Sequence, residues 1–443
     1  MGKIFLKDIT LDGRQVDIVV DGRVIAAIRP AGGWPVKPAM TEGAPAMTEG
    51  APAMTEGASD VTIDCAGKTA MPGFVNAHTH AAMSLMRGVG EDMVLKDWLD
   101  HVWSIEKNLD NDFVYWGTRV AALEMAMTGT TVFNDMYWYP SAAKKATSDS
   151  GLRGVISYVF LDGFNKETAE RQKDECEAFI EEAKSWEDRV IPAISIHSIY
   201  TVREEAIIRA AELARRNGLR IHIHLAETEA EVTDCKAAHG GLTPTEYFDS
   251  LGVLGPDVIA AHSLWLSEKD VEILGRRGVN CVHNINSNLK LASGYRFLWK
   301  ELRDAGANVC LGTDGCASSN NLDMLEAMKT AAIVEKAWRN DPTALPIQEL
   351  LDMATVNGGK ALGLKTGQIQ EGWDADIQIV DTDSTFFLSP APFLANYVYS
   401  AHSDCISSLI AGGRLVMRDR VVEGSKDVLE GGRSQLKQIN KTK

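Results

Sequence analysis

Two histidines stand one residue apart at the end of an apolar run, and this pair is the first feature of the sequence that could do chemistry. The run reads MPGFVNAHTH over residues 71–80 and ends with His78 and His80. Successive side chains of a strand alternate between its two faces, so His78 and His80 share one face. Two imidazoles on one face can bind the same metal ion. The pair therefore predicts a metal site at a strand end.

Other polar side chains occupy the same position at the ends of later apolar runs. These are His197 in RVIPAISIH, His224 in LRIHIHLAE, His262 in DVIAAHS and Asp314 in ANVCLGTDG. A lone histidine on an apolar strand is more often a core residue. That interpretation is kept for His101, His222, His239, His283 and His402. A packed core has no use for a polar group at the end of strand after strand, so we interpret the first set as functional.

Three histidines and one aspartate of this set form the predicted metal site. The predicted ligands are His78, His80, His224 and Asp314. Their nitrogen and carboxylate donors suit one Zn2+, with Fe2+ as the alternative. A water in an open coordination position would have its pKa lowered to about 7. We expect Asp314 and His262 to take the proton of that water and Glu227, in HLAE, to return a proton.

A second metal ion is not expected. A two-metal site of this kind generally needs another anionic bridge, often a carbamylated lysine at the end of the fourth strand. The sequence reads SIHS at that place, which offers His197 and no lysine. One divalent ion is therefore predicted.

The apolar runs that carry these residues recur along the middle of the chain. They cover residues 72–78, 129–135, 153–160, 189–197, 219–227, 257–263, 278–284 and 307–315. Helical stretches lie between them, such as EEAIIRAAELARRNG and EKDVEILGRRG, and both of these end on glycine as a helix C-terminus does. Strands that alternate with helices form a parallel sheet, and eight such units favour a (β/α)8 barrel with its chemistry at the strand C-terminal ends. A doubly wound open sheet is the alternative, but no G-x-G-x-x-G motif follows a strand.

Both ends of the chain contain short strand-like runs separated by glycine turns. They are IFLKDITLD, VDIVVDG, RVIAAIRP and VTIDCAG at the start, and ADIQIVDTD and SLIAGGRLVMRDRVVEG near the end. We expect these runs to form one small β-sandwich domain of residues 1–70 and 366–443, beside a barrel of residues 71–365. Residues 39–58 repeat a seven-residue unit, AMTEGAP. Its glycine and proline exclude a coiled coil and predict a flexible exposed loop.

The composition excludes several classes of partner. The 443 residues are 45% hydrophobic and 24% charged, an ordinary globular balance. The formal net charge of -16 argues against nucleic acid and membrane partners, because an acidic surface repels phosphate backbones and anionic lipid. No stretch approaches the roughly 20 apolar residues of a membrane span. The seven cysteines form no C-x-x-C pair, which suits reduced thiols and a cytoplasmic location.

The sequence resembles the amidohydrolase superfamily, and within it the 5′-methylthioadenosine/S-adenosylhomocysteine deaminases and their chlorohydrolase-like relatives. The resemblance rests on PGFVNAHTH, HIHLAETEAEV, VIAAHSLWL, HNINSNLKLASG and LGTDGCASSNNLDM, in this order and spacing. It implies a metal-dependent deaminase of adenosine-type nucleosides that converts adenine to hypoxanthine and releases ammonia. The nucleosides implied are 5′-methylthioadenosine, 5′-deoxyadenosine, adenosine and S-adenosylhomocysteine. The resemblance also implies a homo-oligomer, either a dimer or a tetramer.

The resemblance assigns roles to individual residues as well. Glu227 matches the residue that protonates the purine ring, and His262 matches the imidazole that orients the water. Glu106, in WSIEKNL, matches a glutamate directed at the ribose hydroxyls, and Arg153, in GLRGVISY, matches a basic residue near the 5′ end of the substrate. The residues expected to contact substrate are Glu106, Arg153, His197 and His224.

Some positions depart from the deaminase pattern. The usual HNPxSN reads HNINSN at residues 283–288, and the usual GAASNN reads GCASSN at residues 315–320. A second arginine, suited to a homocysteine carboxylate, is absent around Tyr158, which favours a neutral 5′ substituent.

The sequence leaves two alternatives to deamination of nucleosides. One is hydrolysis of another heteroaromatic ring, such as guanine, a pterin or an s-triazine. Glu106 and His197 discriminate against it, because such substrates have no ribose diol. The other is a barrel that binds metal without catalysis, but no catalytic or ligand position is missing from the sequence.

Overall fold

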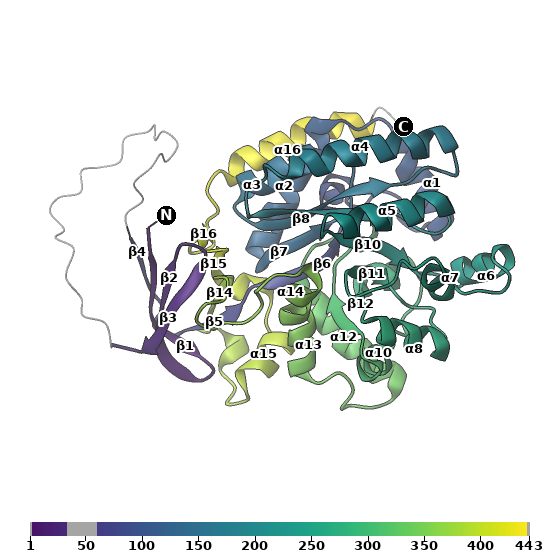
Figure 1. Cartoon of the computed structure of the whole chain (residues 1–443). Coiled ribbons are helices and arrows are strands. Elements are labelled where there is room, and N and C mark those ends of the chain that lie inside the picture. The colour runs from purple at the N-terminus through teal and green to yellow at the C-terminus, as the bar shows by residue number, and fades with distance from the viewer. Residues whose placement is uncertain (1, 33–59, 441–443) are drawn as a thin grey trace.

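Two sheets organise the part of the chain that the structure describes. The structure is a computed structural model that describes residues 2–32 and 60–440 (Figure 1). Each sheet has eight strands, one built from the middle of the chain and the other from both ends. The predicted 39–58 loop lies outside the described residues.

The central sheet is a parallel barrel. Its strands are β6 (Phe74–Thr79), β7 (Thr130–Asp135), β8 (Arg153–Phe160), β9 (Val190–Ile196), β10 (Arg220–Leu225), β11 (Val258–His262), β12 (Asn280–His283) and β13 (Asn308–Leu311). They pair in sequence order from β6 to β13, each parallel to the next. The two end strands meet where the Asp314 N–H donates to the His78 carbonyl at 3.0 Å. The predicted (β/α)8 barrel is confirmed.

Helices follow the strands and cover the outside of the barrel (Figure 1). They are η1 (Ala81–Met86), α1 (Leu95–Glu106), α2 (Asn111–Met127), α3 (Pro140–Ser150), α4 (Lys166–Ala183), α5 (Glu204–Arg216), α6 (Glu229–Ala238), α7 (Pro244–Ser250), α8 (Glu268–Arg277), α9 (Ile285–Lys290), α10 (Trp299–Ala305), α11 (Cys316–Ser319), α12 (Met324–Arg339), α13 (Ile347–Ala354) and α14 (Val356–Leu362). Local sequence sets their ends. In α8, Ser267 and Asp270 form a capping box, and Gly278 ends the helix with a φ of 66°.

The second sheet joins the two ends of the chain. Its strands are β1 (Ile4–Leu11), β2 (Arg14–Asp21), β3 (Val24–Pro30), β4 (Val61–Asp64), β5 (Lys68–Pro72), β14 (Ile377–Asp381), β15 (Ile406–Ala411) and β16 (Arg414–Met417). Their order is β16-β15-β14-β5-β1-β2-β3, with β4 paired to β1. The pairing of β5 with β14 brings the two ends together, as the sequence predicted.

The chain passes from the small sheet into the barrel at Gly73, between β5 and β6. A Cβ at Gly73 would lie 2.3 Å from the Thr131 side chain, so only glycine fits this crossing. The division into residues 1–70 with 366–443, and 71–365, stays a prediction.

The C-terminal part also contains helices. These are η2 (Thr385–Phe387), α15 (Phe393–Tyr399), η3 (Ser403–Cys405) and α16 (Ser425–Asn440). Helix α16 does not extend the small sheet; it packs against α2, where Gly431 leaves room for the ring of Trp116. The last predicted segment of the small domain therefore lies against the barrel.

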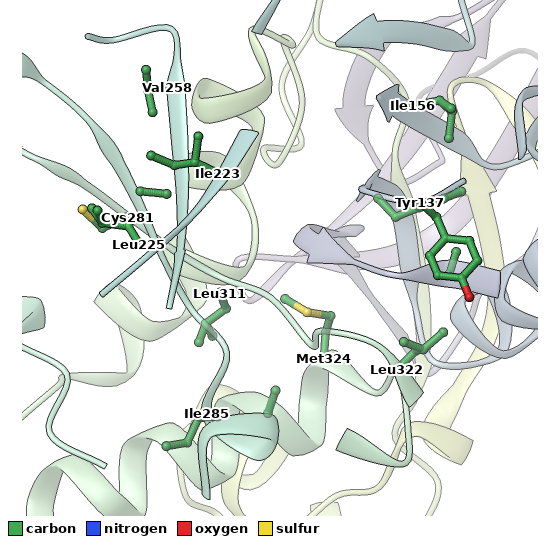
Figure 2. Close-up of a cluster of buried hydrophobic side chains, with 14 of the residues drawn as sticks. Tyr137, Ile156, Ile223, Leu225, Val258, Cys281, Ile285, Leu311, Leu322 and Met324 are labelled. Atoms are coloured by element: carbon green, nitrogen blue, oxygen red, sulfur yellow. The ribbon is translucent and has the colours of Figure 1, made fainter. Parts of the chain in front are cut away.

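The barrel strands separate two buried clusters. One lies between the strands and the surrounding helices and includes Ile223 and Leu225 of β10, with Cys281 and Leu311 from later strands (Figure 2). The other gathers side chains of β6–β9 and β11–β13 with residues of α14. Because Ile223 and Leu225 pack toward the helices, strand alternation turns His222 and His224 to the opposite face. Among the described residues, no helix is both long and apolar enough to span a membrane.

Candidate active site

All but one of the predicted functional residues meet at one rim of the barrel. All eight strands run parallel, so their C-terminal ends lie at the same side. The ring centroids of His78 and His80 are 4.9 Å apart, those of His78 and His224 are 5.0 Å apart, and those of His224 and His262 are 5.4 Å apart. The ring of His197 lies 5.0 Å from that of His224. Stretches that are far apart in the sequence thus bring five imidazoles together.

The donor atoms of these residues fit a metal ion. His78, His80 and Asp314 place one ligand atom each within 4.8 Å of one another, and so do His78, His224 and His262. Burial lowers the pKa of His78 to about 4 and that of His224 well below its ordinary value. Both rings are therefore neutral near pH 7, which is the form that binds metal. Buried imidazole nitrogens and one carboxylate are the donor set of a zinc-type site.

Asp314 is held on both of its oxygens. Its Oδ1 lies 3.3 Å from Nε2 of His78 and 3.3 Å from Nε2 of His80. Its Oδ2 accepts hydrogen bonds from the hydroxyls of Ser287 at 2.6 Å and Ser318 at 3.0 Å. Burial opposes ionisation, but the hydrogen bond and charge of His78 hold the pKa of Asp314 well below its ordinary value. The carboxylate is therefore ionised and fixed in orientation.

Each imidazole that faces the site is anchored through its other nitrogen. The Nδ1 atoms of His80 and His224 lie 2.5 Å and 2.8 Å from the carbonyl oxygens of Met136 and His197. The remaining pairs are His78 Nδ1 with His222 Nε2 at 2.8 Å, and His262 Nδ1 with Asn288 Oδ1 at 2.8 Å. Such anchoring sets the orientation of a ligand ring and leaves Nε2 to face the centre of the site.

Glu227 and His262 face each other beside the cluster of donor atoms. Glu227 Oε2 lies 3.7 Å from His262 Nε2, and Glu227 Oε1 accepts a hydrogen bond from the Ser293 hydroxyl at 3.3 Å. Burial raises the pKa of Glu227 above its ordinary value, which favours a carboxyl that carries a proton. Burial is the largest effect on His262 and lowers its pKa, but the neighbouring carboxylates Glu227 and Asp314 and the Asn288 hydrogen bond together outweigh it, so the pKa is raised overall. The pair can hold and move a proton.

A cavity above these residues is walled by helix α1. The helix contributes Trp98, Trp103 and Glu106, and the turn directly after β9 contributes His197. Glu106 Oε2 accepts a hydrogen bond from Trp138 at 3.3 Å, whereas its buried Oε1 has no hydrogen-bond partner. An unpaired buried carboxylate oxygen beside a cavity is suited to accept a hydrogen bond from a polar substrate group.

Comparison with known proteins agrees with this geometry. The sequence profile described as the Amidohydrolase family matches residues 69–416. The chain belongs to the amidohydrolase family. A 5′-deoxyadenosine deaminase of Methanoregula boonei is 44% identical over 373 residues, which cover 84% of each chain. A 5-methylthioadenosine/S-adenosylhomocysteine deaminase 1 of Archaeoglobus fulgidus is 42% identical, over 84% of this chain and 88% of the relative.

Solved structures share the fold of this amidohydrolase. An adenosine deaminase of Xanthomonas campestris with bound zinc superposes with a TM-score of 0.86 at 29% identity, over 99% of this chain and 98% of the other. A triazine hydrolase variant also reaches a TM-score of 0.86, over 98% and 99% of the two chains. Its 22% identity makes it a relative in fold alone.

One predicted substrate contact of this amidohydrolase is wrong. Arg153 is the first residue of β8, at the N-terminal end of the strand and therefore at the opposite rim from the site. It is 1% exposed and forms ion pairs with Asp374 at 2.9 Å and Asp376 at 2.6 Å, just before β14. Arg153 joins the barrel to the C-terminal segment and does not line the cavity.

Several residues that hold the site of this amidohydrolase together are not predicted from the sequence. The sequence favours a core role for His222, and the signal that points to the site is its place two residues before His224 on the same strand face. Ser287, Asn288 and Ser318 lie in the HNINSN and GCASSN segments, where only the departures from the family pattern were noted. Their contacts with Asp314 and His262 depend on how three separate loops meet.

Proposed function

We propose that this amidohydrolase is a metal-dependent deaminase of adenosine-type nucleosides. It would convert the adenine of 5′-deoxyadenosine, 5′-methylthioadenosine or adenosine to hypoxanthine. The relatives that are 40–44% identical and carry the names of such deaminases support this substrate class. The observation that carries the proposal is the protonatable Glu227 beside His262 and the cluster of metal-binding donors. A homo-oligomer and a cytoplasmic location stay predictions.

One divalent ion, which we propose is Zn2+, would be held by His78, His80, His224 and Asp314. When bound, the ion lowers the pKa of water so that it can attack carbon near neutral pH. His78 belongs to both groups of converging donors. His78→Ala is therefore expected to lose metal and activity together, as measured by metal analysis and ammonia release on one purified sample. His402→Ala, at an exposed histidine, is the matched control. Full metal content in the His78 variant would contradict the ligand assignment.

Three side chains, those of Asp314, His262 and Glu227, would transfer the protons. Asp314 and His262 take the proton of the attacking water while a C6–O bond forms. Glu227, with its pKa raised by burial, gives its proton to the neighbouring ring nitrogen. The proton held by Asp314 and His262 then passes to the amino group, the C6–N bond breaks and ammonia leaves. The proton of the C6 hydroxyl returns to Glu227 as the carbonyl of hypoxanthine forms. Because Glu227 lies 3.7 Å from His262, both groups can act at one substrate carbon.

The ribose would be recognised by Glu106 and His197. Glu106 offers the unpaired Oε1, and His197 is oriented by the contact of its Nδ1 with Thr201 Oγ1 at 2.9 Å. A buried site that binds hydroxyls discriminates strongly against analogues that lack them. Among the described residues that line this cavity there is no lysine or arginine. An adjoining cavity that shares Trp103 and Glu106 with this one does contain Lys107 and Arg171, so the preference for a neutral 5′ substituent applies to the inner cavity.

A substrate panel tests the proposal. Purified protein is incubated with 5′-deoxyadenosine, 5′-methylthioadenosine, adenosine, S-adenosylhomocysteine, adenine, guanine and an s-triazine, and ammonia release is measured. The change in the adenine absorption band reports deamination independently. We expect the highest kcat/KM for the nucleosides with a neutral 5′ group and little turnover of free bases. Robust guanine or triazine turnover with inert adenosine would overturn the proposal.

A further inference from the structure

A second buried glutamate lies next to Glu227 and has no part in the chemistry described above. Glu231 is in the first turn of α6 and is 6% exposed. Its Oε1 accepts a hydrogen bond from the Ala226 N–H at 2.9 Å, and its Oε2 accepts one from the Glu227 N–H at 2.8 Å. One carboxylate therefore binds two successive backbone amides, the second of which belongs to Glu227 itself.

The segment that Glu231 binds is the turn that directs Glu227 into the cavity. Glu227 follows His224 by three residues, so regular strand alternation would turn the two side chains to opposite faces. Ala226 has a φ of 48°, in the left-handed region that residues with a Cβ rarely adopt. This residue breaks the alternation, and His224 and Glu227 consequently line the same cavity. The position of the Glu227 carboxyl depends on an unfavourable backbone conformation.

Other contacts hold the same turn from the opposite side. The Ala226 carbonyl accepts hydrogen bonds from the backbone N–H groups of Leu264 at 3.1 Å and Trp265 at 3.0 Å. At the end of the Glu227 side chain, Oε1 accepts a hydrogen bond from the Ser293 hydroxyl. Glu231 supplies the acceptors for the N–H groups, and without it two adjacent buried donors would lose their partners.

We propose that Glu231 is a positioning residue for proton transfer by Glu227. Its two oxygens hold the left-handed turn at Ala226 and so fix where the Glu227 carboxyl meets the substrate. The inference rests on the proposed function, in which Glu227 delivers the proton. Displacement of a catalytic group by about 1 Å can lower a rate by about a hundredfold, so a backbone clamp of this kind has a large effect on turnover.

The first test replaces Glu231 with glutamine. Glu231→Gln keeps the shape but offers only one oxygen, so one of the two N–H groups faces another donor. We expect kcat to fall about 10- to 100-fold, with KM and metal content little changed. Glu229→Gln, at an exposed position in the same helical turn, is the matched control and should retain kcat. Unchanged kcat in a folded Glu231→Gln protein would overturn the inference.

A double-mutant cycle separates positioning from a general structural role. If Glu231 acts through Glu227, Glu231→Gln should lower residual turnover less than about twofold in the Glu227→Gln background. An equal loss in both backgrounds overturns the inference. Nearly normal turnover of Glu227→Gln alone would instead reject the proposed function. Should Glu231→Gln fail to fold, Glu231→Asp replaces it: the shorter carboxylate should still lower kcat, and full kcat in that variant would overturn the inference.

Discussion

At the scale of residues, contacts behind the rings proposed to bind metal fix the orientation of those rings. His222 Nε2 lies 2.8 Å from His78 Nδ1, and His222 Nδ1 lies 3.1 Å from Asn134 Nδ2. This buried chain of contacts reaches from β7 through β10 to β6. A partner of this kind orients the ligand ring and raises its basicity.

Loss of this contact should weaken metal binding while the ligands stay in place. His222→Leu is expected to lower metal affinity about 10- to 100-fold, because His78 loses the group that orients it. Titration of metal-depleted protein against a competing chelator measures the effect. His402→Leu, at an exposed position, should bind metal like the unaltered protein. Equal affinities in the two variants would show that His222 only packs.

The proposed role of Glu227 in proton transfer predicts the opposite result, in which metal binding is kept and turnover is lost. Glu227→Gln should leave metal content normal and lower kcat about 10²- to 10⁴-fold, because the amide cannot deliver a proton to the ring. Metal analysis and steady-state kinetics on the same preparation measure both quantities. Retention of most activity would remove Glu227 from the mechanism.

At the scale of elements, helix α2 supports the turn that follows His78 and His80. η1 begins directly after His80, and the Ser84 hydroxyl donates to the Gly117 carbonyl of α2 at 2.7 Å. A Cβ at Gly117 would lie 2.5 Å from the Ala82 carbonyl oxygen, which is backbone and cannot rotate away. The close contact of α2 with η1 therefore requires glycine.

Enlarging this glycine should affect both stability and metal binding. Gly117→Ala is expected to lower the free energy of unfolding by about 1–3 kcal/mol through overpacking, and to weaken metal binding because η1 must shift next to His80. Denaturant unfolding and metal titration measure the two effects. Gly432→Ala is the control, since its Cβ would meet no backbone but only the ends of the Val120 and Leu85 side chains, at 2.8 Å and 3.3 Å. Equal effects of the two substitutions would contradict a specific role of the α2–η1 contact.

At the scale of the whole molecule, buried ion pairs connect the barrel to the segment that leads into the small sheet. Arg153 contacts both Asp374 and Asp376, and Asp376 also accepts hydrogen bonds from the Thr366 hydroxyl and the Gly412 N–H. The guanidinium is at the far end of β8 from the catalytic rim. Its removal should affect stability and not substrate binding.

Substitution of this arginine separates the two roles. Arg153→Met is expected to lower the free energy of unfolding by about 3–5 kcal/mol, because two buried carboxylates lose their cation, while KM stays unchanged. Arg276→Met, which removes an exposed ion pair with Asp249, should cost about 0–1 kcal/mol. A large rise in KM for Arg153→Met at unchanged stability would restore the rejected substrate role.

The sequence by itself determined the strands, the barrel and the residues that meet at its rim. These features are local or periodic: apolar runs mark each strand, and the parallel order brings the ends of all strands to one side. The sequence alone therefore predicts that His78, His224 and Asp314 meet there. The pairing of the two chain ends followed from the same short strands and glycine turns.

Only the tertiary structure decided which side chains support those residues. The resemblance to the deaminases implies a substrate contact for Arg153, yet its partners are more than 200 positions away in the sequence, at the other rim of the barrel. The clamp of Glu231 on the turn at Ala226, and the hydroxyls on Asp314, likewise require separate segments to approach within hydrogen-bond distance. Sequence periodicity predicts on which face and at which end of an element a side chain lies. The hydrogen-bond distances between separate segments depend on how the elements pack.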